Sequence, residues 1–150
     1  MKASVIVSVY KNTEFLRVVL DSLRRQTEKD FEIIISEDGE DAGMRAFVES
    51  YAFENPMQHL TQADLGWRKN TALNRAIAAA RAEQLIFIDG DVVLHRRYVE
   101  QMVRHFREDR ILAGKRIYLN AKHTERLLAD SSYIEKMQGV CWRALLRKDG

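Results

Sequence analysis

Two carboxylates separated by one glycine are the residues of this sequence best suited to metal chemistry. Asp89, Gly90 and Asp91 follow directly after the apolar run Leu85 to Ile88. Because that run has the length of a buried strand, both carboxylates leave its carboxyl end, and the glycine lets a backbone or a ligand come close. A divalent cation would remove the repulsion between them, and Mg²⁺ or Mn²⁺ typically binds one or two carboxylates together with waters and substrate phosphates. The motif therefore predicts a metal-assisted diphosphate site.

An ordinary turn is the alternative interpretation of this motif, because aspartate and glycine are also selected for turn geometry. Two features favour the metal site: the motif follows a buried strand, and a second apolar run ends in Ser36, Glu37, Asp38 and Gly39. Asp38 could accept an N–H of a base or a ribose hydroxyl. Glu37 and Asp38 could equally be turn formers beside Gly39.

Basic and amide side chains open the alanine-rich segment near the middle of the chain. Arg68, Lys69 and Asn70 stand at the start of a helix expected from about Trp67 to Arg81. A helix N-terminus favours anions, so cations there work against the helix dipole unless a phosphate binds. We therefore expect these three residues to contact phosphate, the alternative being ordinary surface cations. Trp67 suits stacking on a base or sugar as well as simple packing.

Strands and helices alternate along the chain. Short β-branched and aliphatic runs predict strands at 4–10, 31–36, 57–60, 85–88 and, interrupted by a glycine, 111–119. Helical spacing predicts helices at about 13–26, around 44–51, at 67–81 and 97–108, with one or two short helices in 124–137. This order implies an α/β fold with a mainly parallel sheet and helices on both faces. Ligands of such sheets bind outside the carboxyl ends of the strands, which is where Tyr10, Asp38, Arg68 and Asp89 fall.

Composition excludes several classes of protein. The 150 residues carry 24 Lys and Arg against 22 Asp and Glu, a net charge of +2, so nothing indicates a nucleic-acid partner. The single cysteine, Cys141, excludes an internal disulfide, and the four histidines lack the spacing of a zinc site. No run approaches the roughly 20 apolar residues that span a bilayer, so no transmembrane segment is expected. We expect a single domain in the cytoplasm.

Four segments in a fixed order resemble the family 2 glycosyltransferases with the GT-A fold. They begin at Val5 (VIVSVYKN), Ile33 (IIISEDG), Gly66 (GWRKNTALNRA) and Leu85 (LIFIDGD). Each segment alone is modest, whereas the ordered set is highly specific, and the resemblance extends over nearly the whole chain up to about Leu119. It implies a Rossmann-like nucleotide-sugar-binding domain.

The resemblance also implies roles for individual residues. It assigns donor contacts to Tyr10, Asp38, Arg68, Lys69, Asn70 and Asp89, and metal binding to Asp91 and Asp89. Tyr10 and Asp38 would lie beside the nucleoside, where Asp38 matches an aspartate that contacts the base. Lys69 and Asn70 match a basic-Asn pair near the diphosphate, with Arg68 as their neighbour. Asp89 matches a carboxylate near the donor ribose and sugar.

The implied activity is inverting transfer of a sugar from a nucleoside diphosphate donor, expected to be a UDP-sugar, to an acceptor hydroxyl with the help of Mn²⁺ or Mg²⁺. The acceptor would be a saccharide or glycolipid, and the protein would be cytoplasmic or peripheral at the inner face of the membrane. Residues 1–150 would form a single domain, with the donor-binding half at about 1–119 and the start of an incomplete acceptor-side half at 120–150. The general base is expected beyond Gly150, and exposed apolar surface would favour a homodimer.

Two other function classes stay open at this point. A catalytically incomplete nucleotide-sugar-binding module or fragment would bind the donor without transferring its sugar, because base catalysis and charge stabilisation are separable. A nucleotidyltransferase would use the same carboxylates and metal, but it would need a glycine-rich phosphate loop after the first strand. The sequence has Tyr10-Lys11-Asn12-Thr13 there, which counts against that class.

Overall fold

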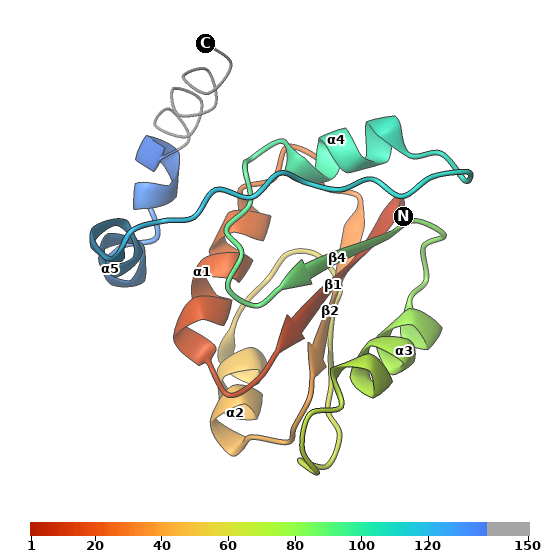
Figure 1. Cartoon of the computed structure of the whole chain (residues 1–150), viewed down its shortest axis with the longest axis horizontal. Helices are drawn as coiled ribbons and strands as arrows, with labels where there is room; N and C mark the ends of the chain where they lie inside the picture. The colour runs from red at the N-terminus through yellow and green to blue at the C-terminus, as the bar shows by residue number, and fades with distance from the viewer. Residues whose placement is uncertain (138–150) are drawn as a thin grey trace.

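A four-stranded parallel sheet forms the centre of the protein. The computed structural model describes residues 1–137; residues 138–150, which include Cys141 and the end of the predicted acceptor-side segment 120–150, lie outside the described residues. The strands lie in the order β3-β2-β1-β4, and the arrowheads of β1, β2 and β4 point toward the same edge of the sheet (Figure 1). The strands are β1 (Ala3–Val9), β2 (Phe31–Glu37), β3 (Met57–Leu60) and β4 (Leu85–Asp89). The parallel sheet expected from the sequence is confirmed.

The two central strands are apolar on both faces because both faces are covered. Val5 of β1 pairs with Ile33 of β2, and Ile6 pairs with Ile34. Successive side chains point to opposite faces, so Val5 and Ile33 join the main core whereas Ile6 and Ile34 join a second cluster. Burial on both sides explains why the middle of each strand, Val5 to Val7 in β1 and Ile33 to Ile35 in β2, is a continuous apolar run rather than an alternating one.

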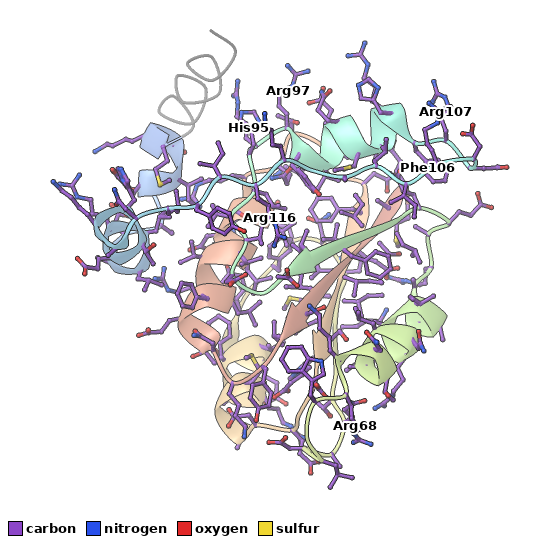
Figure 2. The ribbon with its side chains drawn as sticks, viewed as in Figure 1. Arg68, His95, Arg97, Phe106, Arg107 and Arg116 are labelled. Atoms are coloured by element: carbon purple, nitrogen blue, oxygen red, sulfur yellow. The ribbon has the colours of Figure 1, made fainter. Side chains whose placement is uncertain are left out.

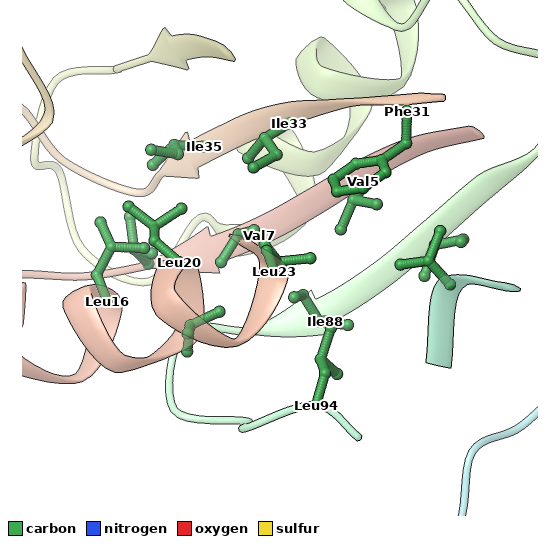
Figure 3. Packing of buried hydrophobic residues seen from close by; sticks show 14 of the residues in the cluster. Val5, Val7, Leu16, Leu20, Leu23, Phe31, Ile33, Ile35, Ile88 and Leu94 are labelled. Carbon is green, nitrogen blue, oxygen red and sulfur yellow. The ribbon is translucent and has the colours of Figure 1, made fainter. Parts of the chain in front are cut away.

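Helices cover both faces of the sheet, as the sequence predicts. α1 (Thr13–Arg24) lies on one face, and Figure 3 shows its side chains packed on β1 and β2: Leu16, Leu20 and Leu23. α3 (Lys69–Ala79) lies on the other face, where Ala76 joins the cluster of Ile6 and Ile34. Helices therefore pack against both faces of the sheet, and loops follow the strands at its carboxyl edge.

The other labelled helices are α2 (Ala42–Ser50), α4 (Tyr98–His105) and α5 (Ala121–Ala129), and residues 133–137 are helical as well. α5 and the helical residues 133–137 confirm the short helices expected in 124–137. α5 contacts α1 through a separate apolar cluster that includes Leu127 and Val18. Across residues 1–137, every helix is too short or too polar to cross a bilayer.

The expected strand at 111–119 is wrong. Residues 106–120 form no strand or helix and run across the molecule from α4 to α5 (Figure 1); we call this segment the strap. Ile111 and Tyr118 are 97% and 88% exposed, respectively. Their β propensity has no neighbouring strand to pair with, and a strand gains its stability from such pairing and packing.

Candidate functional site

The carboxyl ends of the strands bring the candidate residues to one edge of the sheet. Glu37 pairs with Val9 where β2 ends, and Asp89 pairs with Ser8 where β4 ends. Asp38 follows β2 directly, and its backbone N–H donates to the carbonyl oxygen of Val9 at 3.1 Å. The structure thus places Asp38 and Asp89 at the shared edge that the sequence predicts for them.

Asp89 is paired with Lys69, the first residue of α3. Lys69 Nζ donates to Asp89 Oδ1 at 2.6 Å. Arg116 of the strap approaches the other carboxylate oxygen, with 3.7 Å between Nη1 and Oδ2. The Asp89 and Lys69 side chains are 45% and 37% exposed, so a ligand can reach both. A strand end and a helix start that lie 20 residues apart in the sequence are thereby joined by one charged contact.

Gly90 is required by the way the chain leaves β4. A Cβ at this position would lie 2.8 Å from the Ser8 carbonyl oxygen and 2.9 Å from Val9 Cγ1, closer than side chains pack. Only glycine lets the turn pass this close to the end of β1. The turn leaves Asp91 exposed, and no side chain of residues 1–137 forms an ion pair with its carboxylate.

Hydrogen bonds to Asp38 connect the loop before α3 to the end of β2. One carboxylate oxygen accepts from Gln62 Nε2 at 2.6 Å, and the other accepts from the backbone N–H of Arg68 at 2.8 Å. Gln62 Nε2 also donates to the Arg68 carbonyl oxygen at 3.2 Å, and the Gln62 N–H donates to the Gly39 carbonyl oxygen at 3.0 Å. Gln62 is a positioning residue that sequence reasoning misses, because an isolated glutamine in a loop carries no motif.

Arg68 and Lys69 are adjacent but point to different partners. Arg68 Nη2 donates to the Ala63 carbonyl oxygen at 2.6 Å, so the Arg68 guanidinium lies along its own loop, far from Arg116 (Figure 2). Asn70 is exposed in the first turn of α3, whose N-terminus has no side-chain cap among the described residues. The start of α3 therefore combines the Lys69 ammonium group with backbone N–H groups that no side chain caps. Such a combination favours binding of an anion.

Tyr10 and Lys11 join the loop after β1 to the loop before α3. Tyr10 donates from its hydroxyl to Asp64 Oδ2 at 3.3 Å, and Lys11 Nζ lies 2.6 Å from the same oxygen. The hydrogen bond to Asp64 raises the pKa of Lys11, with a smaller contribution from Tyr10. Lys11 has a φ of 50°, which is uncommon and costly for a residue other than glycine. The Tyr10 ring is 54% exposed beside Gly39 and offers a face for stacking.

Glu37 and His59 support the Asp38 loop from inside the sheet. The Glu37 side chain is fully buried, and its Oε2 lies 2.8 Å from His59 Nε2. Its Oε1 accepts from the backbone N–H of Asp41 at 2.9 Å. Sequence reasoning offers Glu37 only as a turn former and gives His59 no role. The signal that could have found the pair is a glutamate at the end of a strand buried on both faces, where an ionisable group needs a partner.

The carboxylates at the end of β4 fit a metal only in combination with a ligand. Among residues 1–137, no three His, Cys, Asp or Glu side chains lie close enough to hold a metal ion by themselves. Asp91 is exposed, whereas Asp89 already binds Lys69. A cation that takes one or two carboxylates and completes its shell with waters and phosphate oxygens is compatible with this arrangement.

The sequence matches a known protein family over most of its length. Residues 4–146 match the family model described as Glycosyl transferase family 2. The chain is 30% identical to the putative glycosyltransferase EpsH of Bacillus subtilis over 162 residues, which covers 97% of this chain and 46% of the relative. It is 33% identical to a validoxylamine A glucosyltransferase of Streptomyces hygroscopicus subsp. jinggangensis over 102 residues, 67% of this chain and 24% of that relative. The chain thus spans less than half the length of these two relatives.

The fold is similar to solved structures of TarS from S. aureus. The structure of TarS residues 1–349 gives a TM-score of 0.59 at 24% identity, over 69% of this chain and 32% of that chain. The same TarS segment in complex with UDP-GlcNAc gives a TM-score of 0.58. The α/β, Rossmann-like GT-A fold expected from the sequence is confirmed.

Proposed function

This chain belongs to glycosyl transferase family 2, and from that premise we propose that the carboxyl edge of its sheet binds a UDP-sugar for inverting transfer to an acceptor hydroxyl. The observation that carries the proposal is the contact between Lys69 and Asp89 beside the exposed Asp91. It brings a cation suited to phosphate and carboxylates suited to a metal to one place. The two relatives are named glycosyltransferase and glucosyltransferase, which favours an enzyme over a module that only binds the donor.

The base of the donor would bind between Tyr10 and Asp38. The exposed Tyr10 ring offers a stacking face. Asp38 already accepts from Gln62 and from the Arg68 N–H, but a carboxylate has about four acceptor positions and can take a further N–H. Uracil presents such a donor at N3, which is compatible with UDP as the nucleotide.

The diphosphate would bind at the start of α3 and the end of β4. Lys69, Asn70 and the uncapped backbone N–H groups of α3 would neutralise and hydrogen-bond the phosphates. Asp91, with Asp89 as second carboxylate, would hold Mn²⁺ or Mg²⁺, which supplies further charge stabilisation to the departing diphosphate. Lys69 is then shared between Asp89 and the phosphates, so its position fixes where the leaving group lies.

The transfer itself is a single displacement at the anomeric carbon. The acceptor oxygen forms a bond to that carbon as the bond to the diphosphate oxygen breaks, the diphosphate leaves with the electron pair, and the configuration inverts. The acceptor hydroxyl gives its proton to a general base. We assign no carboxylate of residues 1–137 to that role, so the proposal concerns the donor side of the reaction.

The proposal also covers the acceptor and the cellular location of the protein. We propose a saccharide or glycolipid acceptor and a protein that is cytoplasmic or peripheral at the inner face of the membrane. The boundary between a donor half at 1–119 and an acceptor-side half from 120 stays a prediction. A homodimer stays a prediction as well, and sedimentation at several concentrations measures it.

The experiment that tests the proposal is calorimetric titration of UDP into the chain with Mn²⁺, with a chelator, and with Asp91→Ala. We expect binding that requires Mn²⁺ and that weakens about tenfold or more in Asp91→Ala, because the variant loses a metal ligand. The matched control is Asp109→Ala, an exposed aspartate of the strap that pairs with its neighbour Arg110. Asp109→Ala should bind UDP like the wild type.

Two results would count against the proposal in different ways. Absence of UDP binding in every condition would remove the donor site altogether. If UDP binds equally well with Mn²⁺, with chelator and in Asp91→Ala, the nucleotide site is supported but the proposed metal site is wrong.

A further inference from the structure

Arg116 is a second cation at Asp89, and it comes from a distant part of the chain. Its Nη1 lies 3.7 Å from Asp89 Oδ2, on the opposite oxygen from Lys69. Figure 2 shows Arg116 between the strap and the end of β4. The Arg116 side chain is 64% exposed. Arg116 therefore stands at the open rim of the proposed donor site, where no part of the sequence motif places it.

The strap is held where it crosses the molecule, so the position of Arg116 has a structural cause. At Gly114 a Cβ would lie 3.0 Å from Tyr98 Cε2 and 3.2 Å from the Tyr98 hydroxyl oxygen, so the strap backbone passes directly against the first residue of α4. Leu119, near the end of the strap, packs against the apolar cluster that joins α5 to α1. Arg116 lies between these two anchor points and is thereby kept close to β4.

The charges at the end of β4 leave Arg116 available for a ligand. Lys69 already forms a hydrogen bond to Asp89 at 2.6 Å, whereas 3.7 Å from Arg116 is too long for a hydrogen bond. An exposed ion pair of this kind holds its partners only weakly. Arg116 therefore keeps hydrogen-bonding capacity for a ligand, and a guanidinium can bind two phosphate oxygens at once.

We propose that Arg116 binds the diphosphate of the donor and is a specificity residue for a phosphorylated ligand. This inference rests on the proposed function and adds a residue to its donor site. When the donor binds, the Arg116 guanidinium exchanges its long contact with Asp89 for hydrogen bonds to phosphate oxygens. Arg110, on the same strap, pairs with its neighbour Asp109 through two contacts of 3.0 Å, and it serves as the matched control.

The test is a binding comparison with UDP and with uridine, using the whole chain in the wild-type form, Arg116→Ala and Arg110→Ala. NMR titration with Mg²⁺ present measures both ligands, including weak uridine binding. Loss of a charge-assisted hydrogen bond predicts UDP binding about tenfold to a hundredfold weaker in Arg116→Ala. Uridine has no phosphate, so its dissociation constant should be equal in all three proteins. Arg116→Lys keeps the charge without the planar fork and should restore part of the UDP affinity.

The outcomes separate this inference from the proposed function. If the wild type binds UDP and Arg116→Ala binds it as tightly as Arg110→Ala does, the inference is wrong and the proposed function stands. If Arg116→Ala weakens UDP and uridine equally, Arg116 acts on the fold or the base site, which also overturns the inference. If the wild type binds no UDP, both proposals fail.

Discussion

At the scale of single residues, the motifs predict where the candidate side chains lie but not which partners they have. Asp38 and Asp89 are read from the sequence as ligand-binding carboxylates, and both lie at the expected edge. In the structure Asp38 also holds the loop before α3, and Asp89 also binds Lys69. These contacts join residues 24 and 20 positions apart. Such pairings depend on how the loops fold over the sheet edge, and no local pattern encodes them.

Gln62 provides the residue-scale prediction, because it orients the carboxylate proposed to recognise the base. Gln62→Ala removes the hydrogen bond at 2.6 Å to Asp38 Oδ1 and the one at 3.2 Å to the Arg68 carbonyl oxygen. We expect UDP binding to weaken by about 1 kcal/mol, a few-fold in Kd. We also expect the preference for UDP over CDP to shrink, since cytosine has no N3–H for Asp38. Calorimetry with both nucleotides measures the ratio.

Gln58 is the control for this prediction, since it is a glutamine of β3 that approaches Glu32 instead. Gln58→Ala should leave the ratio of UDP to CDP affinity unchanged. A ratio in Gln62→Ala equal to that of the wild type would show that Gln62 does not position a base-reading group.

At the scale of elements, hydrophobic periodicity predicts the strands and helices that pack on the sheet. β3 is predicted with its observed bounds, Met57–Leu60, because Pro56 precedes it. The predicted strand 111–119 fails for a physical reason: Ile111 and Tyr118 have β propensity but no strand beside them in the described chain. Periodicity reports which residues suit a strand, and pairing decides whether one forms.

The buried Glu32 is the element-scale feature that the sequence does not reveal. Glu32 is fully buried in β2 and accepts from the Ser4 hydroxyl at 2.6 Å, which joins it to β1. It also accepts from the Arg81 N–H at 2.8 Å and from Arg81 Nε at 2.7 Å, which joins it to the segment before β4. Burial opposes ionisation, but the hydrogen bonds from Ser4 and Arg81 and the charge of Arg81 outweigh it and lower the pKa of Glu32.

This lowered pKa predicts how stability depends on pH. The folded pKa lies below the unfolded one, so ionised Glu32 stabilises the fold above the ordinary pKa of 4.5. That contribution is lost as the pH falls from this value through the folded pKa. We expect Glu32→Gln to reduce the free energy of unfolding by about 1–3 kcal/mol at pH 7. The difference from the wild type should shrink under acid conditions.

Urea unfolding of Glu32→Gln at neutral and acid pH measures this dependence, with the exposed Glu49→Gln of α2 as control. Glu49→Gln should follow the wild type at every pH. A difference between Glu32→Gln and the wild type that stays constant as the pH falls would contradict the assignment of Glu32 as a stabilising charge.

At the scale of the whole molecule, the two edges of the sheet have different character. Near the amino edge, the buried Glu32 carboxylate accepts hydrogen bonds from Ser4 and Arg81. At the carboxyl edge, Asp91 is exposed and Lys69 is accessible beside Asp89. A parallel sheet with loops gathered at one edge is predictable from the order of strands and helices. The strap is not, because its path depends on a close approach of Gly114 to Tyr98 that only the folded molecule shows.

The central claim is that the carboxyl edge binds a nucleoside diphosphate together with a divalent cation. The measurement that tests it most directly is the NMR spectrum of the labelled chain with UDP while Mn²⁺ is added. Because Mn²⁺ broadens the signals of nearby nuclei, we predict selective loss of the backbone amide signals of Asp89, Gly90 and Asp91. The amides of Glu32 and Arg81, at the other edge, should keep their intensity. Broadening centred on any other surface, or broadening at Asp89 to Asp91 that does not depend on UDP, would contradict the account.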